Sequence, residues 1–204
     1  MAVSRQDETT VSDAPRGRGR PRDPQVERAV RFAVWEALGE VGYDRLTMDE
    51  VARRAGCSKP ALYRRWPGKQ PMVLEALEGF IEDTVRARPV RIGEPLDSLV
   101  DWVAGLVIFL SGPGRRALLA LSQARATEPE LAEALDRIVD EDRPKFAVAL
   151  RTAWGQDTPD DAVHRAIDAL LGAVFWRVAL MGRTMSEAEV KALCEDVLRM
   201  RTPA

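Results

Sequence analysis

The fold is decided by residues 46–69, which read LTMDEVARRAGCSKPALYRRWPGK. The four residues that start at Thr47 have the spacing of a capping box, in which two side chains satisfy backbone amides at the start of a helix. Ser58 is placed to cap a second helix just after Gly56, a residue that tolerates the left-handed backbone of a tight turn. The predicted helices span residues 47–55 and 58–65.

The contact between these two helices also has a sequence signature. Ala52 supplies a small residue where the helices touch, and Leu62 supplies an apolar anchor on the second helix, with Val51 packing from the first. Each feature is common alone, but Ala, Gly and Leu at these spacings inside one segment are typical of a helix-turn-helix. We therefore predict that motif here.

The same segment is strongly basic. No Asp or Glu occurs between Glu50 and Glu75, whereas six Lys and Arg residues do. Residues 1–70 hold 14 Lys and Arg against 10 Asp and Glu, and residues 71–204 hold 16 against 22, so the net charge of −2 conceals a basic first third. This asymmetry favours a nucleic-acid-binding head on a body with another role. The alternative is a solvated basic surface.

The rest of the chain shows helical periodicity, with apolar residues at steps of three and four and no long alternation of period two. Gly42 is placed to end the first helix, Thr127 and Ser186 each begin a capping box, and Pro144 is expected to kink the helix that contains it. We predict an all-α fold of about nine helices. They are expected near residues 24–42, 47–55, 58–65, 69–87, 96–110, 115–126, 127–154, 158–178 and 186–198.

Composition excludes several classes of protein. Cys57 and Cys194 lie far apart and His164 is the single histidine, which excludes a disulfide scaffold, a Cys-rich zinc site and a site with several His ligands. Because no motif for a nucleophile, an acid–base pair or a metal cluster occurs, we predict no enzyme activity, no catalytic residues, no metal and no cofactor. No stretch reaches the ~20 apolar residues of a membrane-spanning helix, so a cytoplasmic protein without membrane contact is expected.

Residues 46–69 resemble the N-terminal domain of the TetR family of transcriptional regulators, and the similarity covers about residues 24–80. Cys57 stands where that family more often has valine, and Trp66 where it more often has phenylalanine. The resemblance implies an all-helical homodimer whose C-terminal domain dimerises and usually binds a small-molecule inducer. The expected divisions are a disordered basic arm at 1–22, a helix-turn-helix DNA-binding domain at 23–70, a connecting helix and linker at 71–94, and a ligand-binding and dimerisation domain at 95–204.

The second helix of such a motif lies in the major groove of DNA with its first residues nearest the base edges. Arg64 suits bidentate hydrogen bonds to guanine, Lys59 can donate to the same base, and Pro60 offers apolar contact to a thymine methyl group. The Tyr63 hydroxyl and the Lys69 ammonium suit phosphates, which fix the register without reading the sequence. The expected DNA-binding residues of this domain are Thr47, Ser58, Lys59, Pro60, Ala61, Tyr63, Arg64 and Lys69.

The arm that precedes the first helix contains Arg18-Gly19-Arg20-Pro21, which resembles the core of an AT-hook. In such a segment Arg18 and Arg20 would lie in a narrow minor groove, where A·T-rich sequence enhances the negative potential. The alternative is an unstructured basic tail that adds only salt-sensitive attraction to phosphates. We expect a minor-groove arm.

Aromatic residues are frequent in the C-terminal half, where they can line a ligand cavity or form ordinary core. Arg177 can counter an acidic ligand or a partner subunit, and it can equally extend to solvent. The last two helices have apolar faces that suit a four-helix bundle with a second copy, which would match a palindromic operator. We expect a ligand-released repressor, the alternative being a DNA-binding regulator or architectural protein without an inducer. The candidate ligand-binding residues are Trp102, Phe109, Phe146, Phe175, Trp176 and Arg177.

Overall fold

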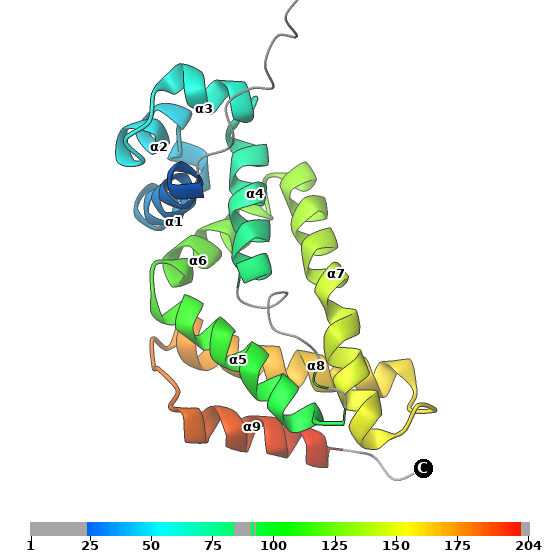
Figure 1. Ribbon diagram of the computed structural model, residues 1–204. Coiled ribbons are helices and arrows are strands. Elements are labelled where there is room, and N and C mark those ends of the chain that lie inside the picture. The colour runs from blue at the N-terminus through cyan, green and yellow to red at the C-terminus, as the bar shows by residue number, and fades with distance from the viewer. Residues whose placement is uncertain (1–23, 84–90, 92, 201–204) are drawn as a thin grey trace, which may run out of the picture.

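The computed structural model describes residues 24–83, 91 and 93–200, and in these residues it contains nine α-helices and no β-strand (Figure 1). The predicted all-α fold is confirmed. The helices are α1 Pro24–Arg45, α2 Met48–Arg54, α3 Lys59–Arg65, α4 Lys69–Ile81, α5 Pro95–Ser111, α6 Gly114–Ala124, α7 Pro129–Trp154, α8 Asp160–Val174 and α9 Glu187–Arg199, and the π-helical segment η2, Phe175–Leu180, continues α8.

Three helix starts follow the predicted caps. The hydroxyl oxygens of Thr47 and Ser58 each accept a hydrogen bond from the backbone N–H three residues later, at 3.2 and 3.4 Å, and Ser186 begins a complete capping box. The capping box predicted at Thr127 is wrong. Helix α7 begins two residues later with no side-chain cap, and the Thr127 hydroxyl instead donates to the carbonyl of Ala124.

Two glycines take the backbone conformation that their positions require. Gly42 interrupts α1 with φ 77° and ψ 171°, and Gly56 turns the chain between α2 and α3 with φ 65°. Both lie where residues with a Cβ atom are strained. Helix α7 runs through Pro144 as one element of 26 residues. The expected end of the fourth helix near residue 87 falls outside the described part of the chain.

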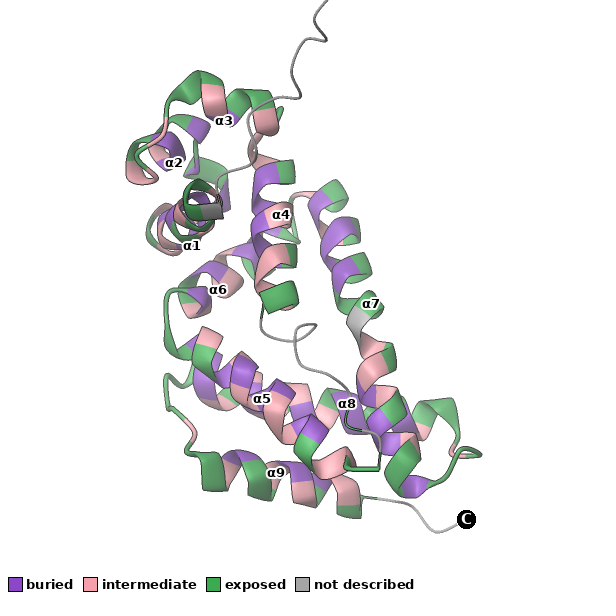
Figure 2. Ribbon diagram, in the orientation of Figure 1, coloured by how far each residue is buried: buried purple, intermediate pink, exposed green. Residues whose placement is uncertain are grey.

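The first of two hydrophobic cores lies among α1, α2, α3 and α4, and helices from later in the chain close it (Figure 2). The expected division at residue 95 therefore does not separate the cores, because α6 and the first half of α7 belong to the first one. The residues that these later helices contribute are Ala117, Leu121, Ala124, Leu131, Leu135 and Ile138.

Helices α1 and α6 form the most extensive contact between helices in the structure. Gly39 permits this approach, since a Cβ atom built there would lie 2.8 Å from the Cβ of Arg116. Residues with side chains cannot pack at that distance without displacement. The close packing of α6 against α1 ties the helix-turn-helix to the C-terminal half.

The second core is built from α5, the second half of α7, α8, η2 and α9. Trp102 of α5 is 1% exposed, and its ring meets Phe146 of α7 edge to face with 5.0 Å between ring centroids. The indole N–H of Trp154 donates to the carbonyl of Leu198 at 2.7 Å, which fixes the end of α7 to α9. Buried tryptophans need such a partner for their polar atom.

Phe109 packs against both cores. Its ring stacks on Phe80 of α4 at 3.7 Å between centroids and meets Trp35 of α1 edge to face at 5.2 Å. A Cβ atom at Gly114 would lie 2.1 Å from the Phe109 ring, so the glycine leaves the space that the ring occupies. One aromatic side chain thus joins α1, α4 and α5.

Within the described helices none is by itself long and apolar enough to cross a membrane. Helices α5 and α6 pass that test together by length and composition alone, and they are bent by 88° where they meet. The described residues also contain no group of three or more His, Cys, Asp or Glu side chains able to hold a metal ion.

Replacing Phe109 by alanine should lower the free energy of unfolding by about 3 kcal/mol, because it removes the ring that packs on both cores. Urea unfolding at a fixed protein concentration, followed by circular dichroism, measures the change. Ile108→Ala is the matched control, since Ile108 is 67% exposed on the same helix and should change stability by no more than about 0.5 kcal/mol. Equal effects of the two substitutions would contradict the joining role of Phe109.

Candidate nucleic-acid interface

The residues from which the helix-turn-helix was predicted form the apolar contact between its two helices. Val51 is fully buried, and Ala52 and Leu62 are each 2% exposed, so the predicted contact between α2 and α3 is present. The N–H of Cys57 donates to the carbonyl of Ala52 at 3.0 Å and closes the turn. Burying these apolar residues on one side leaves the opposite side of α3 facing solvent.

The outer face of α3 presents both charge and apolar surface. Lys59, Pro60 and Arg64 are exposed, and Tyr63 is 51% exposed. Ala61 is half-buried. No ion pair among the described residues involves Arg64, whose guanidinium lies on this open face. A short helix with its polar face unobstructed has the form of an element that enters a groove of DNA.

Carboxylates of α2 are paired with cations next to this face. Asp49 forms an ion pair with Lys59 at the start of α3. Glu50 accepts hydrogen bonds from Arg53 and Arg54, at 2.6 and 2.7 Å, and these two partners lower the pKa of its carboxyl to about 2. Arg54 also reaches Glu40 of α1 at 2.5 Å, so α2 is fixed to α1 by charge as well as by apolar packing.

The side chain of Lys69 lies at the end of α1. Its ammonium donates to the carbonyls of Tyr43 and Asp44, at 3.0 and 3.3 Å, and lies 4.3 Å from the centre of the Tyr43 ring. The start of α4 beside it, at Gly68, has no side-chain cap. Free backbone amides at a helix start attract anions, so the neighbourhood suits a phosphate even though Lys69 already has partners.

Four further residues were expected to contact DNA, two in the helix-turn-helix and two in the basic arm. Thr47 and Ser58 are exposed, and the oxygen of each hydroxyl is used as a helix cap. Arg18 and Arg20 of the basic arm lie outside the described residues. The hydroxyls can still donate outward because capping uses them as acceptors.

The six candidate ligand-binding residues do not surround one space. Trp102 and Phe146 pack on each other inside the second core, and Phe109 packs between the two cores. Trp176 is 60% exposed and points away from both cores, whereas Phe175 is half-buried. Arg177 forms an ion pair with Glu189 that ties η2 to α9.

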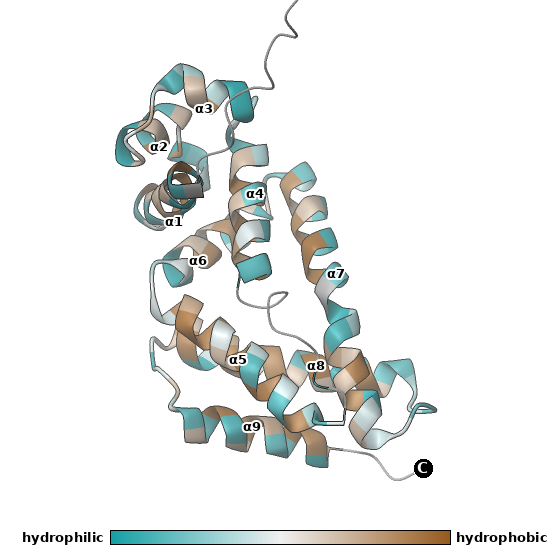
Figure 3. Ribbon diagram, in the orientation of Figure 1, coloured by the Kyte–Doolittle hydropathy of each residue, from teal (hydrophilic) through white to brown (hydrophobic). Residues whose placement is uncertain are grey.

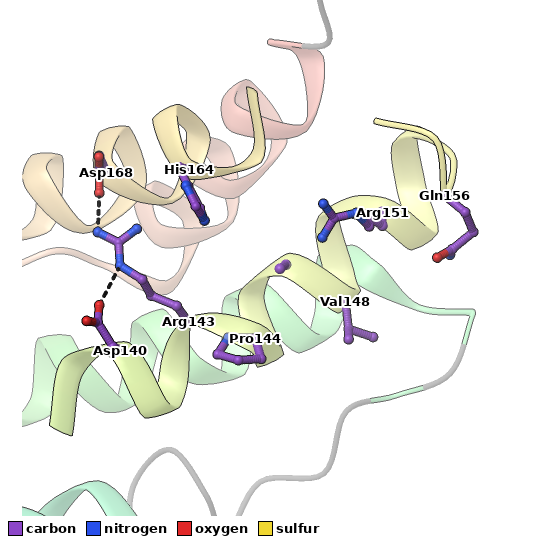
Figure 4. Close-up of a pocket in the computed structure, with 9 residues that line it drawn as sticks. Asp140, Arg143, Pro144, Val148, Arg151, Gln156, His164 and Asp168 are labelled. Carbon is purple, nitrogen blue, oxygen red and sulfur yellow. Dashed lines mark hydrogen bonds and ion pairs between the residues drawn. The ribbon is translucent and has the colours of Figure 1, made fainter. Parts of the chain in front are cut away.

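A hollow of about 750 Å³ lies instead between α7 and α8 (Figure 4). Pro144, Ala147 and Val148 of α7 supply apolar lining, and His164 of α8 points toward α7 across the gap. Its volume lies within the range of ligand pockets in proteins. One feature of the sequence marks this place, a proline inside a helical pattern.

Charged side chains form the rim of this hollow. Arg143 bridges the two helices, since its guanidinium contacts Asp140 of its own helix at 3.5 Å and Asp168 of α8 at 2.8 Å (Figure 4). Arg151 lies farther along α7 and pairs with Asp160 at the start of α8. The hollow therefore combines an apolar wall with arginines and carboxylates that already pair with one another.

Two family models match the chain. "Bacterial regulatory proteins, tetR family" matches residues 33–76, and "Tetracyclin repressor-like, C-terminal domain" matches residues 92–197, about half of the chain. The chain belongs to the TetR family. The match to the N-terminal model contains all of α2 and α3, so every exposed residue of α3 described above lies inside the family's DNA-binding domain.

Several regulators are similar to this chain over most of its length. The HTH-type transcriptional regulator Rv1556 of Mycobacterium tuberculosis is 30% identical over 187 residues, which is 88% of this chain and 91% of the relative. The crystal structure of the TetR family transcription regulator SCO0332 is 33% identical with a TM-score of 0.61, and the similarity covers 88% of this chain and all of that one (100%). The flavonoid-responsive regulator FrrA is 22% identical with a TM-score of 0.59, covering 87% and 95% of the two chains.

These similarities establish the general function of the protein. This TetR-family protein is a DNA-binding transcriptional regulator, and its family is one of regulators rather than enzymes.

Proposed function

We propose that this protein is a repressor that binds a palindromic operator as a homodimer in the cytoplasm and leaves it when a small molecule binds. The observation that carries the proposal is the outer face of α3, where Arg64 and Tyr63 are exposed while Leu62 anchors the opposite side. A recognition helix needs this division, because its position must be fixed from behind while its front reads bases.

In this proposal the side chains on and around α3 contact either bases or phosphates, according to their chemistry. Arg64 reads guanine through two hydrogen bonds, and Lys59 exchanges its ion pair with Asp49 for a base edge. Pro60 and Ala61 contact thymine methyl groups. Phosphates are bound by Thr47, Ser58, Tyr63 and Lys69, and Arg18 and Arg20 enter the adjacent minor groove.

We propose that dimerisation at the last two helices uses the surface on and after η2, which continues α8. The apolar faces that suggested a bundle, with residues such as Ile167 and Val197, lie largely in the chain's own second core. Outward-facing apolar side chains remain on and after η2, where Trp176, Leu180 and Met181 are 60%, 42% and 48% exposed. Apolar side chains clustered on a surface favour a protein–protein contact, and we place the dimer interface there.

The hollow between α7 and α8 is the place where we propose that the ligand binds. Its apolar wall and charged rim suit an amphipathic small molecule. FrrA, which shares the fold, is described as flavonoid-responsive. The alternative is a regulator whose DNA binding does not respond to any small molecule.

Arg64→Ala should weaken binding to the operator by about 1–3 kcal/mol and relax specificity at one base pair. The operator is obtained by selecting duplexes from a random pool with the wild-type protein, and fluorescence anisotropy compares it with a scrambled duplex. Arg137→Ala, at an exposed arginine of α7, is the control and should bind like the wild type. Unchanged operator binding by Arg64→Ala would refute the role of α3.

Trp176→Asp should convert the dimer to a 22.6 kDa monomer, because a charge at the centre of an apolar interface must be desolvated without a partner. Light scattering coupled to size-exclusion chromatography measures the mass, and Ile108→Asp, which also places a charge on an exposed apolar position, should stay dimeric. A Trp176→Asp protein that remains a dimer would place the interface elsewhere.

Filling the hollow should abolish the response to ligand without changing operator affinity. Amphipathic acids and flavonoids are screened for release of the wild-type protein from its operator, and Val148→Trp should then need at least about tenfold more of the active compound, about 1.4 kcal/mol of lost binding. Val139→Trp is the control, since this valine is 48% exposed on the same helix and does not line the hollow. A screen without any releasing compound would favour the ligand-independent alternative.

A further inference from the structure

A cluster of polar side chains joins the end of α3 to α4. Both carboxylate oxygens of Glu75, on α4, accept hydrogen bonds from this end: Oε1 from the guanidinium of Arg65, and Oε2 from the indole N–H of Trp66 at 2.8 Å. Arg65 is the last residue of α3, and Trp66 is its C-cap, whose backbone N–H donates to the carbonyl of Leu62 at 3.0 Å. The carboxylate therefore holds the last turn of α3 directly.

The same cluster reaches α1. Arg65 donates to the carboxylate of Glu27, on α1, at 2.7 Å, and its guanidinium carbon lies 4.5 Å from the centre of the Trp66 ring. Trp66 is 6% exposed, so its ring is fixed by packing while its N–H points to Glu75. Arg65 and Trp66, at the end of α3, therefore connect α3 to both α1 and α4.

The covalent connection alone leaves the angle between α3 and α4 open. Only Pro67 and Gly68 separate Trp66 from the first residue of α4, and Gly68 is extended, with φ −171° and no side-chain cap on α4. One hydrogen bond would leave rotation about its axis free. Two hydrogen bonds from one carboxylate to different side chains fix both position and rotation, and bonds to a charged group are stronger than neutral ones.

We propose that Glu75 is a positioning residue for sequence-specific DNA binding, because it sets the angle of α3 through Arg65 and Trp66 without contacting DNA itself. The inference rests on the proposed function in that α3 is the element that reads bases. Specific binding requires α3 to present its side chains at one angle, whereas attraction to phosphates tolerates a range of angles. Loss of Glu75 should therefore affect the two kinds of binding unequally.

The test compares Glu75→Gln with Glu78→Gln, which removes the same charge from an exposed position of α4. Glutamine keeps one acceptor oxygen but turns an NH₂ group toward the second donor, so one of the two contacts is lost. Glu75→Gln should bind the selected operator about tenfold more weakly than Glu78→Gln, within the range for substitutions that act at a distance. Both variants should bind the scrambled duplex within about twofold of each other.

A purely structural role of Glu75 would lower the melting temperature and weaken both duplexes by the same factor, and that outcome would overturn the proposal. Trp66→Phe provides a second variant, because it removes the indole N–H and keeps an aromatic ring in the core. The double variant Glu75→Gln with Trp66→Phe should bind the operator no more weakly than the weaker single variant. Fully additive losses would show that the two side chains act separately.

A readout without DNA separates this proposal from the function on which it rests. In the ¹H–¹⁵N spectrum the indole signal of Trp66, assigned by its absence in Trp66→Phe, should move in Glu75→Gln and stay in place in Glu78→Gln. A stationary signal would overturn the contact itself. If Arg64→Ala impairs operator binding while Glu75→Gln and Glu78→Gln bind it equally, only the positioning role of Glu75 fails. If Arg64→Ala binds as the wild type does, the proposed role of α3 fails.

Discussion

The ring of Phe109 packs at once on Phe80 of α4, on Trp35 of α1 and on the second core below it, and the arrangement of the molecule depends on this contact together with that of α6 on α1. A helix-turn-helix of some fifty residues buries a small share of its surface and is expected to be only marginally stable alone. Helices α6 and α7 supply the missing surface from the second half of the chain. The two halves of the chain therefore share the first core, since both contribute residues to it.

This shared interior limits how the two parts can move. Helix α7 contributes Leu131, in its N-terminal half, to the first core and Leu150, in its C-terminal half, to the second. A displacement of the C-terminal half of α7 therefore also displaces its N-terminal half. Helix α5 is apolar along much of its length, in keeping with its place in the second core (Figure 3). Close-packed protein interiors transmit displacements because they have little free volume to absorb them.

On the outer face of α3, a cation without an ion pair among the described residues lies next to cations that have one. Asp49 pairs with Lys59, Glu50 with Arg53 and Arg54, and Glu75 with Arg65, whereas Arg64 projects from α3 without an ion pair among the described residues. Ion pairs on the flanks fix the orientation of the helices, and under the proposed function the unpaired Arg64 reads the DNA. In that proposal, orientation and recognition belong to different members of one basic segment.

The sequence by itself determined the local structure. Thr47, Ser58, Gly42 and Gly56 act within a few residues of themselves, so their effect on helix ends could be predicted from spacing. The spacing of Ala52, Gly56 and Leu62 likewise identified Leu62 as the buried anchor of α3.

Only the tertiary structure decided which faces meet. Apolar positions of α8 and α9 look the same in sequence whether they pack within the chain or against a second copy, and the fold buries them within the chain. Trp102 and Phe146 proved to be core, and the hollow lies on the far side of α7. The contact of Glu75 with Trp66 likewise arises only when α4 is placed against the end of α3. Such pairings depend on the relative placement of whole helices, and helical periodicity specifies a buried face without specifying its partner.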